Sequence, residues 1–178
     1  MKKVPMFFAL ALMYSPFVIA EPDDKGKLND GEILQILVTA NRGDIENGQL
    51  ARKKASNKQV RAFANRMIKE RTDLNKEAKV IVAKLKKPTE ESTIGKDLKA
   101  DGKNTQNQLK NLNGSEFDKA YIDAEIKHNL KLIDVADNTL VPNVKDEALK
   151  ALLTKVRPAL AAHIELAKTI QGTILDNR

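Results

Sequence analysis

The 178-residue chain contains no cysteine and no tryptophan, and only 4% of its residues are aromatic. Without cysteine there can be no disulfide bond, no thiolate metal site and no cysteine nucleophile. The shortage of aromatic side chains leaves little surface on which nucleic-acid bases can stack. The sequence also lacks the motifs of phosphate-binding loops, dinucleotide-binding folds, hydrolases with a nucleophile elbow and zinc proteases. We therefore assign no catalytic residue and favour a protein that is not an enzyme.

The first twenty residues have the pattern of a secretory signal peptide. Lys2 and Lys3 precede a mostly apolar run that ends in Val18-Ile19-Ala20, before a polar segment. This pattern predicts cleavage after Ala20; the alternative is an uncleaved anchor, for which the run is short. No later apolar run is long enough to span a bilayer. We thus predict an exported, periplasmic protein with a signal peptide over residues 1–20, a disordered lead over 21–28 and one helical domain over 29–175.

Basic residues outnumber acidic ones, but the two kinds alternate along the chain. The formal net charge is +7, and loss of the two signal-peptide lysines lowers it to about +5. Runs such as Lys69-Glu70-Arg71-Thr72-Asp73 are typical of a solvated helix face and not of a nucleic-acid site. An excess of positive charge also permits weak attraction to an anionic membrane, peptidoglycan or an acidic protein. We expect the partner to be an envelope protein or an anionic envelope component, and no nucleic acid.

Apolar residues recur at steps of three and four over most of the domain, which predicts amphipathic helices. Three pairs are spaced like the capping boxes that begin helices: Asn29 with Glu32, Ser56 with Gln59, and Ser115 with Asp118. We predict long helices from residue 29, from residue 57, over residues 116–138 and from Asn143. The last of these is expected to be kinked, or broken into two helices, at Pro158. Residues 88–103 are expected to form one long connection, followed by a short helix over 106–112. The prediction is an all-α, antiparallel four-helix bundle.

Both histidines of the chain lie on predicted inward faces of helices. Glu125 stands three residues before His128, a spacing that lets one helix offer a carboxylate and an imidazole to a metal in a bundle core. Asp44 and Arg71 interrupt the apolar faces of the first and second helices. We predict a core polar network formed by Asp44, Arg71, Tyr121, Glu125, His128 and His163.

Four short strings follow one another along the chain: Gly48-Gln49-Leu50-Ala51, Phe63-Ala64-Asn65-Arg66-Met67-Ile68, Gly114-Ser115-Glu116-Phe117-Asp118-Lys119-Ala120-Tyr121 with His128, and Pro158-Ala159-Leu160-Ala161-Ala162-His163 with Ala167. In this order they resemble a family of secreted bacterial proteins of unknown function, often labelled predicted outer membrane proteins. The resemblance spans residues 29–170 and implies a ferritin-like four-helix bundle, export and descent from a metal-binding ancestor.

One position departs from the pattern of this family. The family has an acid followed by histidine where this chain has Glu70-Arg71, so a guanidinium replaces an imidazole. Arginine stays protonated and does not ligate metals. If it faces inward, it must pair with a carboxylate, since an unpaired buried charge is very costly. Asp44 and Glu125 are the expected partners.

The sequence leaves three functions open. The first is an exported, non-enzymatic bundle for binding or stress protection in the envelope, with its metal site lost and no cofactor. The second is a metal-binding or metal-dependent redox protein that holds a single transition-metal ion with His128, His163 and a carboxylate of Glu125 or Asp44. The third, suggested by small size, export and basic charge, is a secreted inhibitor or immunity-type protein.

Overall fold

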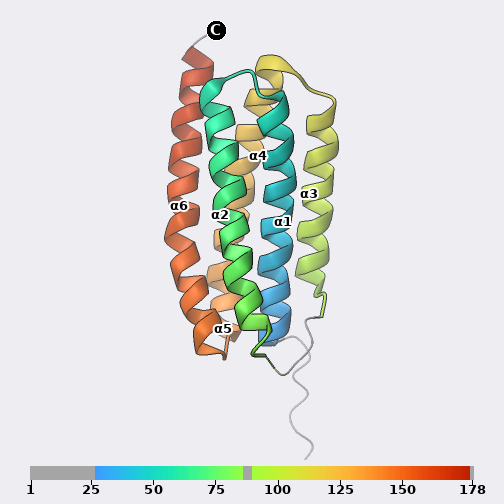
Figure 1. The fold of residues 1–178 in the computed structure, drawn as a ribbon, viewed down its shortest axis with the longest axis vertical. Coiled ribbons are helices and arrows are strands. Elements are labelled where there is room, and N and C mark those ends of the chain that lie inside the picture. Colours follow the sequence, from blue (N-terminus) through green and yellow to red (C-terminus); the bar gives the residue numbers. More distant parts are fainter. Residues whose placement is uncertain (1–26, 86–89, 177–178) are drawn as a thin grey trace, which may run out of the picture.

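The computed structural model describes residues 27–85 and 90–176, and these residues form helices and short connections without a strand (Figure 1). The long helices are α1 (Asp30–Lys54), α2 (Lys58–Val82), α3 (Thr93–Lys110), α4 (Gly114–Val135) and α6 (Glu147–Asp176). A π-helical turn, η1 (Ala136–Leu140), and the short α5 (Val141–Asn143) join α4 to α6. The all-α prediction is confirmed. The predicted signal peptide and most of the predicted lead lie outside the described residues.

The helices run alternately up and down along one axis, with α1 beside α2 and α4 beside α6 (Figure 1). These four helices enclose a common core, and α3 lies on the outer side of α1. The ferritin-like topology implied by the family resemblance stays a prediction. Within the described residues no helix is long and apolar enough to cross a membrane.

The predicted long connection is wrong over most of its length, because α3 begins at Thr93. The sequence of α3 is polar, and it buries only a few apolar side chains against the bundle, mainly Leu98 and Leu109. The Ser92 hydroxyl accepts a hydrogen bond from the backbone N–H of Gly95 (3.1 Å) and so begins the helix. Gly102 and Gly43 face each other across the contact with α1, where a Cβ on Gly102 would lie 3.6 Å from the Gly43 Cα. Small residues thus replace an apolar stripe in this contact.

Of the three predicted capping boxes, the one at Asn29 is confirmed. The other two are wrong, because Asn57 begins α2, and Asn113 precedes α4 without a side-chain cap. Asp118 is instead buried and accepts hydrogen bonds from the backbone N–H groups of Ser56 (3.0 Å) and Asn57 (2.8 Å), and from the Ser56 hydroxyl. The carboxylate on α4 therefore fixes the turn between α1 and α2.

The last long helix begins later than predicted and continues past its proline. Asn143 ends α5, and Asp146 accepts a hydrogen bond from the Leu149 N–H (2.9 Å) at the beginning of α6. Pro158 lies inside α6, which is one helix from Glu147 to Asp176, so a break into two helices is excluded. A kink at this proline stays a prediction.

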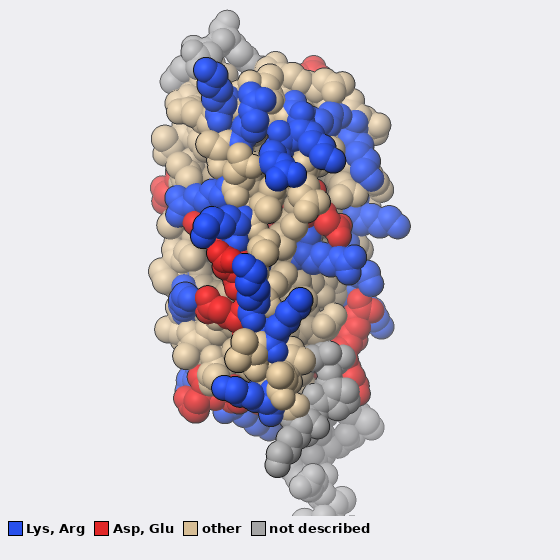
Figure 2. Space-filling model, in the orientation of Figure 1, with Lys and Arg blue, Asp and Glu red and all other residues tan. Residues whose placement is uncertain are grey.

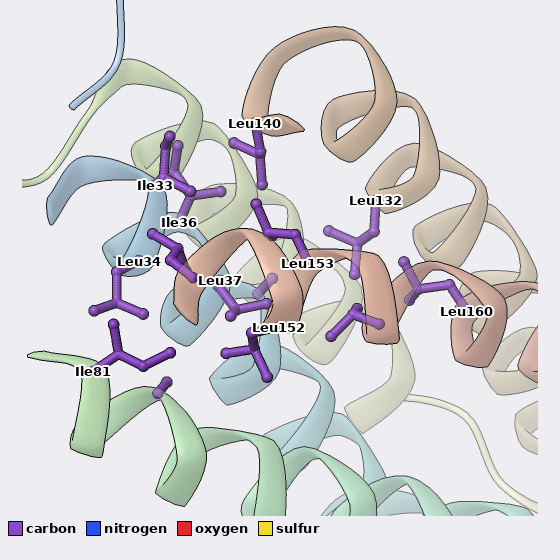
Figure 3. Packing of buried hydrophobic residues seen from close by; sticks show 14 of the residues in the cluster. Ile33, Leu34, Ile36, Leu37, Ile81, Leu132, Leu140, Leu152, Leu153 and Leu160 are labelled. Atoms are coloured by element: carbon purple, nitrogen blue, oxygen red, sulfur yellow. The ribbon is translucent and has the colours of Figure 1, made fainter. Parts of the chain in front are cut away.

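Two separate clusters of buried apolar residues fill the bundle. One lies near the start of α1 and α6 and includes the leucines and isoleucines of Figure 3. The other surrounds Phe63, Phe117 and Tyr121 near the turn between α1 and α2. Polar residues lie between the two clusters along each of α1, α2, α4 and α6. This polar layer holds the candidate functional residues.

Gly48 permits the close contact between α1 and α2. A Cβ there would lie 3.0 Å from Cγ1 of Ile68 and 3.3 Å from the Ala64 carbonyl oxygen, whereas a Cβ on Gly172 would meet nothing within 4 Å. We predict that Gly48→Val lowers the free energy of unfolding by about 1–3 kcal/mol, because it overpacks this contact. Gly172→Val should be close to neutral. Urea unfolding measures both; equal stability of the two variants would contradict the close contact.

Candidate functional site

The candidate site is a layer of polar side chains halfway along the bundle. Each of the four core helices contributes at least one member that is almost inaccessible to solvent. An apolar cluster covers the layer at either end, so these groups depend on one another for hydrogen bonds and charge balance. The buried members are Asn41, Asp44 and Asn47 of α1, Arg71 of α2, Glu125 and Asn129 of α4, and His163 of α6.

An ion pair between Arg71 and Asp44 lies in this layer. The Arg71 Nε is 2.8 Å from Oδ2 of Asp44, and at most 3% of either side chain is exposed. The Nε–H group is not aimed at this oxygen, so the contact is an ion pair without an aligned hydrogen bond. Arg71 also donates a hydrogen bond from Nη2 to Oδ1 of Asn129 (2.9 Å). The guanidinium thus bridges α1 and α4.

His128 approaches the same carboxylate from α4. Its Nε2 lies 3.1 Å from Oδ1 of Asp44, and 18% of its side chain is exposed. Burial disfavours the charged forms of both His128 and Asp44, but the attraction between the two groups outweighs this penalty. At Asp44 the positive charge of Arg71 adds to this attraction. The pKa of His128 is therefore raised, and the pKa of Asp44 is lowered. Both oxygens of Asp44 face a cationic or protonatable group.

Glu125 carries the second carboxyl group of the layer, and its protonation near neutral pH differs from that of Asp44. Burial, together with the negative charge of Asp44, raises its pKa to about 8. The same two effects, burial and neighbouring carboxyl groups, raise the pKa of Tyr121 well above its usual value. Near neutral pH the layer therefore contains one carboxylate, Asp44, and one protonated carboxylic acid, Glu125.

A small cavity of about 20 Å³ lies beside these groups. Oδ1 of Asn47 is buried without a hydrogen-bond partner, and the Tyr121 hydroxyl is buried beside Glu125. Asn47 and Tyr121 line the cavity together with Asp44, Glu125 and His128. About 10–15 Å³ is enough for one water molecule, so the cavity has room for a single water or ion.

His163 contacts a different carboxylate from His128. Its Nε2 lies 2.6 Å from Oε2 of Glu70, which also pairs with Arg66 (2.7 Å). Burial lowers the pKa of His163 despite this contact. The imidazole also lines a groove of about 260 Å³ between α2 and α6, beside Leu74 and Val156. The two histidines therefore belong to opposite parts of the layer, and their nearest carboxylates are on different helices.

The structure brings together Asp44, Arg71, Glu125 and His128, with Tyr121 beside them, while His163 pairs separately with Glu70. Sequence reasoning did not include Asn129 or Glu70 in the network. Asn129 follows Glu125 by four residues, so helical spacing alone could have placed it on the inward face. In the described part of the chain, no three histidine, aspartate or glutamate side chains are arranged to hold a metal ion.

A family model described as a domain of unknown function, DUF4142, matches residues 19–170. The chain belongs to this family. Among solved structures it is similar to CopM in the Cu(II)-bound form, with a TM-score of 0.66 and 18% sequence identity, over 83% of this chain and 98% of that one. At this identity the likeness shows a shared fold alone. No curated protein matches the chain.

Removal of the Arg71 side chain leaves Asp44 buried with a weaker counter-charge. We predict that Arg71→Ala lowers the free energy of unfolding by about 3–5 kcal/mol. Arg42→Ala, which breaks the exposed pair with Glu46, should cost at most about 1 kcal/mol. Chemical denaturation of both variants measures the difference. A loss for Arg71→Ala as small as that for Arg42→Ala would contradict the buried ion pair.

The raised pKa of Glu125 makes stability depend on pH. Because the pKa is about 8 in the folded protein and ordinarily 4.5, the folded chain keeps a proton that the unfolded chain releases between these values. Stability should therefore fall as pH rises from about 4.5 to about 8, by up to about 1.4 kcal/mol per pH unit. Glu125→Gln cannot ionise and should flatten this decline, whereas the exposed Glu46→Gln should not. Urea titrations across this pH range would contradict the assignment if native and Glu125→Gln profiles ran parallel.

Proposed function

We propose that this protein is an exported, non-enzymatic helical bundle that binds another envelope component, and that an ion pair has replaced a metal in its core. The observation that carries the proposal is the 2.8 Å contact between the buried Arg71 and Asp44. A fixed cation at this place repels a metal ion and uses the carboxylate that would hold it. The bundle then serves as a rigid scaffold for surface interactions.

The protonation of the neighbouring groups supports the same conclusion. Metal ligands act as carboxylates and neutral imidazoles. Glu125 is protonated near neutral pH, and the raised pKa of His128 favours its charged form. A metal ion would have to displace the proton of Glu125, compete with the protonation that the raised pKa of His128 favours, and move Arg71 away from Asp44. Each of these steps lowers the affinity of the layer for a metal.

A second candidate function is the binding of one transition-metal ion, such as copper. It is favoured by the cavity beside Asp44, Glu125 and His128, which has room for one ion, and by the similarity in fold to CopM in its Cu(II)-bound form. Its ligand set would contain His128 without His163, because His163 pairs with Glu70.

Metal binding by untagged protein separates the two candidates. We predict that the native protein, purified without chelators, contains no stoichiometric metal and binds Cu(II) or Zn(II) weakly in calorimetric titration. Arg71→His removes the fixed charge and adds an imidazole, so it should bind the metal more tightly than native protein. Arg42→His, an exposed change of the same kind, should bind it no better than native protein.

The opposite result would favour the second candidate. Stoichiometric metal in the native protein that is lost in His128→Ala would show that the layer is a metal site and would overturn the proposed replacement. His163→Ala tests the ligand set separately, since loss of metal in this variant would bring His163 into the site.

A further inference from the structure

The end of the bundle that carries the turn between α1 and α2 is strongly basic. Five exposed cations lie there: Arg52 and Lys53 at the end of α1, Lys58 and Arg61 at the start of α2, and Lys110 at the end of α3. We call this set the basic end. Figure 2 shows positive side chains gathered across this end of the visible face, whereas positive and negative side chains alternate lower down.

The cations of the basic end have no carboxylate partner among the described residues. Some basic side chains elsewhere are paired, as Lys131 is with Asp101 (2.6 Å) and Arg157 with Asp137 (2.9 Å). Others, such as Lys79 and Lys127, have no ion pair within the described residues either, but they lie apart from one another along the helices. The nearby Asp118 is buried and accepts hydrogen bonds from Ser56 and Asn57, so it lies beneath the surface. The exposed Glu116 in the first turn of α4 also lies at this end, but no ion pair joins it to any of the five cations. The positive charge of this end is therefore only partly offset.

Helix stability explains only part of this arrangement. Cations in the last turns of α1 and α3 are favourable, because the C-terminus of a helix carries partial negative charge. Lys58 and Arg61 lie instead in the first turn and a half of α2, whose first turn contains no acidic residue. Cations at this position oppose the helix dipole, so they weaken the helix that carries them. Their presence points to an anionic partner outside the chain.

We propose that the basic end binds the surface of an anionic lipid bilayer. The cations are spread over three neighbouring helix ends, so together they can contact a partner with a broad negatively charged surface. The three described aromatic residues, Phe63, Phe117 and Tyr121, are all buried and offer no stacking platform for nucleic-acid bases. The inference rests on the proposed envelope-binding function and on the predicted export.

The strength of such binding follows from the number of cations. Each lysine or arginine close to an anionic bilayer strengthens binding by roughly fivefold, and the effect falls off within about one Debye length. Five cations without an inserted apolar anchor give reversible binding that weakens as salt is added.

Vesicle co-sedimentation of the full exported chain tests the proposal. Native protein should sediment with vesicles of equimolar phosphatidylcholine and phosphatidylglycerol, but not with phosphatidylcholine alone, and added salt should release it. The variant Lys53→Glu/Lys58→Glu/Arg61→Glu should bind on the order of 100-fold more weakly. The control Lys79→Glu/Lys127→Glu/Lys150→Glu makes the same change in net charge at exposed lysines away from the basic end and should retain most of the binding.

Thermal unfolding of both triple variants keeps a folding defect separate from a binding defect. A glutamate at position 58 favours the start of α2, so the basic-end variant should remain folded while it loses binding. Two results with vesicles would overturn the proposal: no binding by native protein, or equal losses of binding in the two variants. Two results with other ligands would also overturn it: tighter binding to duplex DNA than to anionic vesicles at the same salt, or release from vesicles by millimolar inorganic phosphate at constant ionic strength. None of these outcomes changes the metal measurements that test the proposed function.

Discussion

The buried contact between Arg71 and Asp44 constrains the rest of the bundle. A charge at this depth is tolerated only beside its counter-charge, so α1 and α2 must keep the register that places these two side chains together. His128 on α4 approaches the other oxygen of the same carboxylate, and Asn129 accepts a hydrogen bond from the guanidinium. Three helices are therefore aligned by one ion pair and its neighbours. The apolar clusters on either side provide burial, but apolar side chains alone tolerate shifts of register more readily.

The function that we propose depends on a difference between the interior of the bundle and its surface. In the interior Asp44 is charged and pairs with Arg71, and Glu125 is protonated, while Oδ1 of Asn41 and Oδ1 of Asn47 have no hydrogen-bond partner. The surface carries several ion pairs along the bundle and a cluster of five cations without a carboxylate partner at one end. A packed interior combined with a positively charged end suits the docking role that we propose.

The inward faces of the helices could be predicted from sequence because helical spacing and apolar content report burial directly. Arg71 and Asp44 were predicted to lie on these faces, and they are buried. The helix α3 was missed because its contact with α1 uses glycines and few apolar residues, so its sequence reads as a polar connection. Asp118 was misread as a helix cap, since a local motif does not reveal a hydrogen bond to a turn sixty residues away. The pairing of His163 with Glu70 likewise depends on how α2 and α6 pack, which spacing within one helix cannot give.

The central claim is that Arg71 and Asp44 are energetically coupled in the core. A double-mutant cycle with Asp44→Asn, Arg71→Met and the double variant measures this coupling directly in unfolding free energy. Each single variant should be strongly destabilised, because it leaves one member of the pair without its partner, and the double variant should recover much of the loss. We predict a coupling energy of about 3 kcal/mol or more. Additive effects within about 0.5 kcal/mol would show that the two residues act independently and would contradict it.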